Sequence, residues 1–511
     1  METDFDYIII GSGAGGGTIA HKLAKTGRKI LIIERGGFLP REIENWQARS
    51  VFVEGRYSPK EKWLDKDGKA FTPGTHYYVG GNTKFYGAAL LRLREKDFGE
   101  IKHYGGTSPA WPLKYDDMKP YYMEAENLYE VHGERKADPT EPHEDRPYPF
   151  PAVSHEPIIQ DIFEKLQKEN LKPFHLPLGI RLNEKRPEVS LCVRCSTCDG
   201  YPCLVDAKSD SQHICLMPIL KQENIHLLTN AQAMRLITDD SGHKVVAVEV
   251  KQDNEIKRLH AHTFIVSCGA INSAALFLRS KSSKHPTGLA NSSDLVGRNY
   301  MCHQNSAIVA ISTQKNTTKF QKTIGLNDFY FGADDSDLPL GHIQLLGKVK
   351  EGMLKADAPP FTPKAVLKAM ADHAIGWWIT SEDLPDPDNR VLVDDQGRIT
   401  LKYTPNNTEA HSRLLKKLKM ILNFTGHKFH FPNTAYLAKR IPVAGVAHQV
   451  GTMRFGNDPG TSVLDLSCKT HDLDNVYVVD GSFFPASGAV NPGLTIIANA
   501  LRVGDILSSV H

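Results

Sequence analysis

Long apolar runs are missing from this 511-residue sequence, in which runs such as "YIII" and "ILII" are only the length of a strand. We therefore predict no transmembrane helix, because a helix needs about 20 apolar residues to cross a bilayer. The N-terminus, "METDFDYIII", also lacks the basic region and the apolar stretch of a signal peptide. We accordingly expect a cytoplasmic protein.

A charge excess of either sign is missing as well, because 61 Lys and Arg residues offset 59 Asp and Glu residues and leave a net charge of +2. A protein that binds nucleic acid or an anionic membrane usually carries a basic surface. We expect neither as a partner. The eight cysteines are too few for a secreted disulfide scaffold. Length and composition indicate an ordinary globular protein of two or three domains.

The scarce cysteines are nevertheless clustered, because "CVRCSTCDGYPC" holds Cys192, Cys195, Cys198 and Cys203. Closely spaced thiolates are the ligands of iron–sulfur clusters and of structural zinc. Their spacing matches neither a ferredoxin run nor two separated zinc-binding pairs. Four interpretations stay open: an iron–sulfur relay, a zinc site, one or two disulfides or a redox-sensitive thiol pair, and reduced structural cysteines. The expected cytoplasmic location argues against disulfides.

A nucleotide-binding pattern opens the chain. The apolar segment "DYIII" predicts a strand that runs into "GSGAGGG", and a helix and a second strand ending in an acidic residue follow. This order is typical of the βαβ unit that binds dinucleotides, with the pyrophosphate at the helix N-terminus and the ribose on the acid. The pattern does not separate NAD from FAD. The predicted contacts are Gly11, Gly13, Gly15, Gly16, Glu34 and Arg35.

The other end of the chain carries a second part of this pattern. Residues 475–479 predict a buried strand, Asp480-Gly481 a sharp turn, and "PGLTIIANALRVGDIL" an apolar helix. A nucleotide domain that begins near residue 6 and closes near residue 508 is discontinuous, and this layout favours a flavin dinucleotide. The predicted α/β fold is a Rossmann-like FAD-binding domain formed by residues 1–100, 191–300 and 440–511. An inserted α+β substrate domain with lid or loop insertions occupies residues 101–190 and 301–439.

Four sequence blocks resemble the glucose–methanol–choline (GMC) family of FAD-dependent oxidoreductases. They begin with "DYIIIGSGAGGGTIAHKLAKTGRKILIIERGG", "VGGNTKFYGAALLRLREKDF", "FIVSCGAINSAALFLRS" and "AHQVGTMRFG", and the last continues in "VYVVDGSFFPASGAVNPGLTIIANALRVGDIL". The residues of these blocks resemble the sugar-oxidising branch of the family, around pyranose oxidase and bacterial sugar and glycoside dehydrogenases. The resemblance implies oxidation of an alcohol, with transfer of a hydride to flavin N5.

Such a reaction requires a base for the hydroxyl proton and a donor that holds the developing alkoxide. By resemblance, the catalytic histidine falls on His448 and its partner on Asn491. The resemblance also places the flavin near the backbone of Gly81, the side chains of Asn82 and Thr83, and a C-terminal segment. That segment contributes Asp480, Gly481, Asn491, Pro492 and Thr495. Because "GGNTKFYG" contains no histidine, we expect noncovalent FAD.

The resulting prediction is an enzyme that oxidises a CH–OH group of a sugar or glycoside to the carbonyl. Its partners would be a small-molecule alcohol and either oxygen or an external electron acceptor, and an oligomer is possible. Four alternatives stay open: oxidation of non-sugar alcohols, a non-redox lyase on the same scaffold, an electron-transfer subunit built around the cysteines, and an NAD-linked dehydrogenase.

Overall fold

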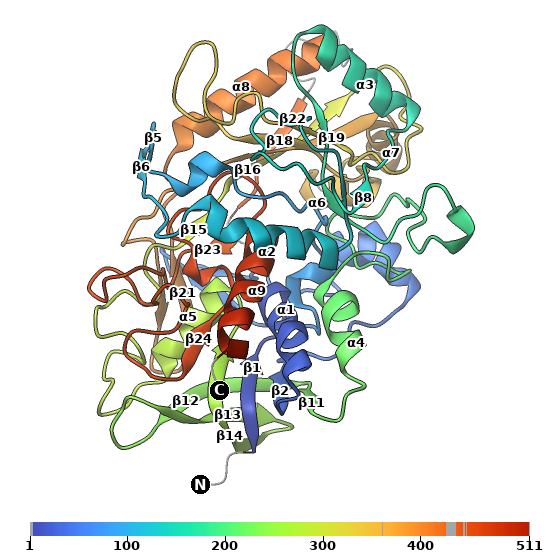
Figure 1. Ribbon diagram of the computed structural model, residues 1–511. Helices are drawn as coiled ribbons and strands as arrows, with labels where there is room; N and C mark the ends of the chain where they lie inside the picture. Colours follow the sequence, from blue (N-terminus) through green and yellow to red (C-terminus); the bar gives the residue numbers. More distant parts are fainter. Residues whose placement is uncertain (1–3, 360, 426–435, 443–444, 446, 510–511) are drawn as a thin grey trace.

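A computed structural model describes residues 4–359, 361–425, 436–442, 445 and 447–509. Two large sheets dominate it, one in the lower and one in the upper half of Figure 1. In the residues described, no helix combines the length and the apolar character that crossing a membrane requires.

The lower sheet is built around parallel strands in the order β11-β2-β1-β14, and β24 continues the row beside β14. The N-terminal part of β14 bends away into an antiparallel ribbon with β13 and β12. Buried isoleucines in β1 and β2 form the centre of the main core. The strands span β1 Phe5–Ile10, β2 Ile30–Ile33, β11 Ile225–Leu228, β12 Ala231–Thr238, β13 Val245–Gln252, β14 Glu255–Val266 and β24 Val476–Val478.

Helices from both ends of the chain cover this sheet. Helix α1 (Ala14–Leu23) packs against α9 (Gly493–Ser509), which in turn packs against α2 (Tyr115–Leu128). Helix α5 (Ala270–Arg279) packs against β12 and the short segment Gly481–Phe483. The first and last helices of the described chain, α1 and α9, therefore lie side by side on this sheet, as the sequence predicts (Figure 1).

The upper sheet has six antiparallel strands in the order β22-β16-β19-β18-β17-β9. One of its faces packs against α3 and α8 through a separate core, and the other faces the nucleotide layer. The elements are β9 Phe174–His175, β16 Gln304–Ile311, β17 Ile324–Leu326, β18 His342–Leu345, β19 Ala374–Ser381, β22 Tyr436–Arg440, α3 Pro157–Lys168, α6 Glu351–Asp357, α7 Lys364–Asp372 and α8 Thr408–Phe424.

Within the described residues, four small sheets, the short helix α4 and several single helical turns complete the fold. In one of these sheets, β20 and β21 join β3 and β4 from a distant part of the chain. The remaining elements are β3 Trp63–Asp65, β4 Ala70–Phe71, β5 Ile101–His103, β6 Gly106–Ser108, β7 Val131–Gly133, β8 Phe150–Pro151, β10 Leu178–Gly179, β15 Met301–Cys302, β20 Arg390–Val393, β21 Ile399–Lys402, β23 Gln449–Val450 and α4 Met217–Ile219. The predicted α/β class is confirmed, whereas the exact domain ranges stay a prediction.

Candidate active site

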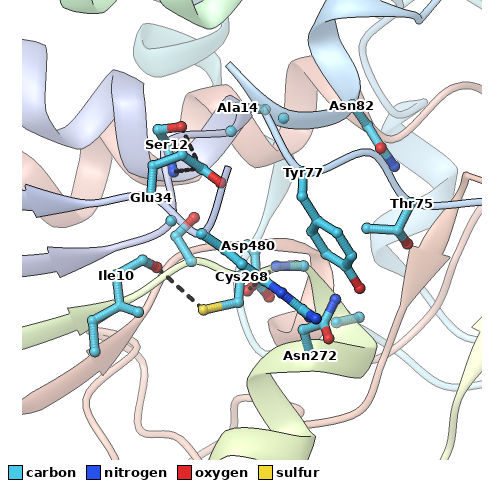
Figure 2. Close-up of a pocket in the computed structure, with 18 of the residues that line it drawn as sticks. Ile10, Ser12, Ala14, Glu34, Thr75, Tyr77, Asn82, Cys268, Asn272 and Asp480 are labelled. Atoms are coloured by element: carbon cyan, nitrogen blue, oxygen red, sulfur yellow. Dashed lines mark hydrogen bonds between the residues drawn. The ribbon is translucent and has the colours of Figure 1, made fainter. Parts of the chain in front are cut away.

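An elongated cavity begins where β1 and β2 end and the glycine turn leads into α1 (Figure 2). Glu34 at the end of β2 accepts hydrogen bonds from the Ser12 backbone and hydroxyl and from Gly36 N. These bonds hold the acid at the edge of the cavity, and burial raises its pKa. This is the position from which an acid can bind a ribose hydroxyl.

The glycines of the turn differ in what a Cβ atom at each position would contact. A Cβ at Gly11, whose φ is +100°, would lie 2.2 Å from Ser267 O, and one at Gly15 would lie 2.1 Å from Val479 O. A Cβ at Gly16 would lie 2.0 Å from Gly11 O, so this glycine permits close packing of helix and strand. A Cβ at Gly13 meets nothing within 4 Å, because it would project into open space. The turn is thus tightly packed behind and open at Gly13, as a pyrophosphate cradle requires.

Ten of the fourteen predicted cofactor contacts line this cavity: Gly11, Gly13, Gly15, Glu34, Arg35, Gly81, Asn82, Thr83, Asp480 and Gly481. Asp480 accepts hydrogen bonds from Ser482 and Ser273 and from Gly269 N, so it ties the C-terminal loop to the start of α5. Gly16, Asn491, Pro492 and Thr495 are not among the lining residues. Thr495 is fully buried, and its Oγ1 lies 2.8 Å from Tyr122 Oη. The direct contacts assigned to these four stay predictions.

Sequence reasoning missed a second group of lining residues, Tyr77, Cys268, Asn272 and Arg279. Figure 2 shows Tyr77 and Asn272 together on one side of the cavity. Three of them, Cys268, Asn272 and Arg279, lie within the block "FIVSCGAINSAALFLRS". Membership of that block is the one feature of the sequence that could have indicated them. Single polar residues of this kind carry no pattern until the fold brings α5 to the edge of the sheet.

His448 belongs to a segment that borders this cavity, because its neighbours Ala447 and Gln449 line the cavity together with Gly13. Asn491, just before α9, lies close to it, with Nδ2 3.4 Å from His448 Nε2. The structure therefore brings together the two side chains that the sequence paired, although their catalytic roles stay predictions.

A second histidine completes the group. Strands β15 and β23 pair with Cys302 opposite Gln449, so the next residue along one strand, His303, faces His448. Their Nδ1 atoms lie 2.9 Å apart. No sequence pattern indicates this contact, because it depends on the register of two short strands that are far apart in the chain.

The hydrogen bonds of His303 determine the tautomer of His448. Burial lowers the pKa of His303 to about 4, so its ring is neutral near pH 7. Its Nε2 lies 3.5 Å from the Ser487 carbonyl, which can only accept, so Nε2 carries the hydrogen and Nδ1 is an acceptor. His448 must therefore donate from Nδ1, which leaves the lone pair on Nε2. Burial also holds the pKa of His448 well below its usual value.

The lone pair of His448 Nε2 is thus directed toward Asn491, in a ring that is neutral at physiological pH. This arrangement combines a proton acceptor with an amide hydrogen-bond donor, and alcohol oxidation requires both groups. Trp378 of β19 packs beside it, with ring centroids 5.1 Å apart. The adjacent Trp377 belongs instead to the core on the other face of the sheet.

The four clustered cysteines are free, partly buried thiols: Cys192, Cys195, Cys198 and Cys203. Within the described residues, which include all four, no group of three or more His, Cys, Asp or Glu side chains is arranged to hold a metal ion. The structure therefore gives no support to the predicted metal role, which stays a prediction.

Comparison with known proteins places the chain in a family. Sequence models of the GMC oxidoreductase family match residues 5–305 and 385–500, so the chain belongs to this family of flavoprotein oxidoreductases. The 6'''-hydroxyparomomycin C oxidase of Streptomyces lividus is 31% identical over 532 residues, which cover 99% of this chain and 91% of that protein. Paromamine 6'-oxidase of Streptomyces fradiae is 30% identical and covers 99% of this chain and 92% of its own length.

Two further relatives extend the comparison. The fructose dehydrogenase large subunit of Gluconobacter japonicus is 24% identical over 98% of this chain and 97% of its own length. Among solved structures, pyridoxine 4-oxidase from Mesorbium loti has a TM-score of 0.70 at 17% identity, covering 99% of this chain and all of its own. At that identity the structural likeness bears on the fold alone.

Proposed function

We propose that this protein is an FAD-dependent enzyme that oxidises a CH–OH group of a sugar or glycoside to the carbonyl, with His448 as the base. One observation carries the proposal: the residues on both sides of His448 line the same cavity as the glycine turn. A dinucleotide anchored by its pyrophosphate at Gly13 would therefore share this cavity with the segment that carries the histidine.

FAD fits the residues that are present. The open space beside Gly13, the N-terminus of α1 and Glu34 suit the pyrophosphate and a ribose. Gly81, Asn82, Thr83 and Gln449 line the same cavity and suit the ring system of the flavin. When bound, FAD supplies the acceptor for the hydride that leaves the alcohol carbon. We propose noncovalent binding, since the loop "GGNTKFYG" offers no histidine for attachment.

The chain's own side chains handle the proton and the oxygen. His448 Nε2, which carries the lone pair of the ring, would accept the proton of the substrate hydroxyl while the C–H bond breaks. Asn491 Nδ2, 3.4 Å from His448 Nε2, donates a hydrogen bond to the oxygen as negative charge develops on it. His303 holds the ring in place through Nδ1. The resulting product is a carbonyl compound.

The names of the relatives support a carbohydrate substrate. The two relatives of about 30% identity are named as oxidases of paromomycin-type compounds, and a third is named for fructose. We extend to this chain only what these have in common, a hydroxyl group on a sugar or amino sugar.

The decisive experiment is anaerobic mixing of the purified holoenzyme with a panel of sugars, glycosides and simple alcohols. We expect sugars or glycosides to bleach the flavin absorbance, and readmitted air, a quinone or a dye to restore it. The rates of recovery then separate an oxidase from a dehydrogenase. Absence of bleaching across the whole panel would refute the proposal.

A further inference from the structure

A second cavity lies on the face of the six-stranded sheet that is turned toward the nucleotide layer. Its volume is about 820 Å³, and its described lining is mainly apolar. Ala307 and Val309 of β16 and Gly376 of β19 form its floor, and Leu354 of α6 and Met370 of α7 contribute side chains from the helices above. Nothing in the nucleotide-binding pattern accounts for this space.

Two of the charged side chains that line this cavity are bound to other parts of the protein. Asp199 forms an ion pair with Lys322. Lys348 Nζ donates to the carbonyls of Asn316 and Thr318, at 2.6 and 2.8 Å. The mainly apolar lining therefore offers chiefly hydrocarbon to a ligand.

The cavity and the catalytic pair lie on the two sides of Trp378. Ala307, on the cavity floor, lies directly opposite Trp378 in the register of β16 and β19. The ring of Trp378 is 5.1 Å from that of His448. A ligand that fills the cavity and also reaches the base would therefore pass along this side chain.

Two polar side-chain atoms without a partner lie on the neighbouring strands β18 and β19, close to Trp378. Gln344 of β18 lies opposite Trp378 in the sheet register and is fully buried. Its Oε1 lies 3.1 Å from His342 Nε2, whereas its Nε2 has no partner among the described residues. Trp378 Nε1 is buried and without a partner in the same way. Buried polar atoms are nearly always hydrogen-bonded, so these two point to a polar ligand beside His448.

We propose that the substrate is a glycoside whose sugar ring binds beside His448, Trp378 and Gln344 while its apolar aglycone occupies the 820 Å³ cavity. This inference rests on the proposed function and adds the substrate class. An amphipathic molecule matches both ends, since hydroxyl groups satisfy the two unpartnered side chains and a hydrocarbon group displaces water from the apolar walls.

The test is steady-state kinetics of the holoenzyme with methyl, hexyl and octyl glycosides of one sugar, below their micelle concentrations, and with a disaccharide of that sugar. We expect kcat/KM to rise at least tenfold from methyl to octyl glycoside, and the disaccharide to stay near the methyl glycoside. Equal values along the alkyl series, or an equal gain with the disaccharide, would overturn the aglycone assignment. The proposed function stands in either case, whereas a flavin that no sugar or glycoside reduces overturns both.

Two variants locate the effect. Leu354→Gln and Met370→Gln place amides on side chains that are only partly buried, which limits damage to the fold. Each is expected to reduce the octyl-to-methyl ratio of kcat/KM at least threefold and to leave the methyl glycoside within twofold. The matched control is Met420→Gln on α8, whose side chain is 53% exposed and outside the cavity. A ratio unchanged in both cavity variants, or lowered equally by the control, would contradict the assignment.

Discussion

At the scale of single residues, the two ring nitrogens of His448 contact different neighbours and have different roles. Nδ1 faces His303, and Nε2 faces Asn491. Removing the ring should abolish proton acceptance and leave the nucleotide cradle intact, since the cradle is built from β1, α1 and β2. We expect His448→Ala to lower kcat by about a thousandfold, or about 4 kcal/mol of transition-state stabilisation, with FAD still bound.

This expectation is checked by stopped-flow flavin reduction and by the flavin-to-protein absorbance ratio of the purified variant. Turnover near that of the wild type would remove His448 from the mechanism. Loss of FAD from the variant would instead show that the ring supports the cofactor site.

His303 is a positioning residue, because it acts on the substrate only through His448. His303→Leu removes the acceptor for Nδ1–H and releases the ring to adopt either tautomer. We expect kcat to fall because the transition state loses about 1–3 kcal/mol of stabilisation, which is the usual cost of leaving a buried hydrogen-bond donor without a partner. His303→Gln retains an acceptor and should recover part of the rate. A role in packing alone predicts equal rates for both variants, with no difference in their pH profiles.

The pH dependence follows from the state of the base. Burial holds the pKa of His448 well below its ordinary value of 6.5, so the ring is unprotonated at neutral pH. Activity that needs the neutral ring is present above the pKa and is lost as the pH falls through it. We expect kcat/KM to stay level from pH 8 to 6.5 and to decline only below that. A decline that begins above pH 7 would contradict this environment.

At the scale of secondary-structure elements, the turn between β1 and α1 separates folding from cofactor binding. A methyl group at residue 15 would collide with Val479 O at 2.1 Å, whereas one at residue 13 meets open space and φ there is an ordinary −70°. Gly15→Ala should therefore disturb the contact of α1 with the segment after β24. Gly13→Ala should retain the fold and weaken FAD binding.

The two variants are a matched pair for measurement. Circular dichroism and thermal unfolding of the apoproteins should show a lower midpoint for Gly15→Ala and an unchanged one for Gly13→Ala. FAD titration should show at least tenfold weaker binding for Gly13→Ala. Equal FAD affinity in Gly13→Ala and the wild type would mean that the pyrophosphate does not approach this residue.

Elements with a strong local pattern were predictable from the sequence, and contacts that depend on register were not. The β1–α1–β2 unit follows from apolar runs and glycine spacing, and the return of α9 to it follows from the second nucleotide segment. His303 has no such signal, because only the pairing of β15 with β23 places it opposite His448. Trp378 and Trp377 are likewise neighbours in sequence, yet the alternation of a strand sends them to opposite faces.

At the scale of the whole molecule, the loop with the four cysteines borders the apolar cavity of the six-stranded sheet. Cys198 lines the apolar cavity, and the neighbouring Asp199 pairs with Lys322 and accepts a hydrogen bond from Gly347 N. Lys208 Nζ donates to the carbonyls of Cys198 and Tyr201, at 3.0 and 2.9 Å. These contacts assign the loop a structural task, as a wall of the cavity.

A structural role and an electron-transfer role of these cysteines lead to different predictions. A relay requires thiolates gathered around iron, whereas the described residues show four free thiols, and burial raises the pKa values of Cys192 and Cys198 to about 11 and 12. We therefore expect the purified protein to carry no stoichiometric iron or zinc, and Cys192→Ser and Cys203→Ser to reoxidise within about twofold of the wild-type rate. Elemental analysis and dye-linked turnover test both points. Near-stoichiometric metal that is lost in either variant, together with slower reoxidation, would restore the relay and make the cysteines the exit for the flavin's electrons.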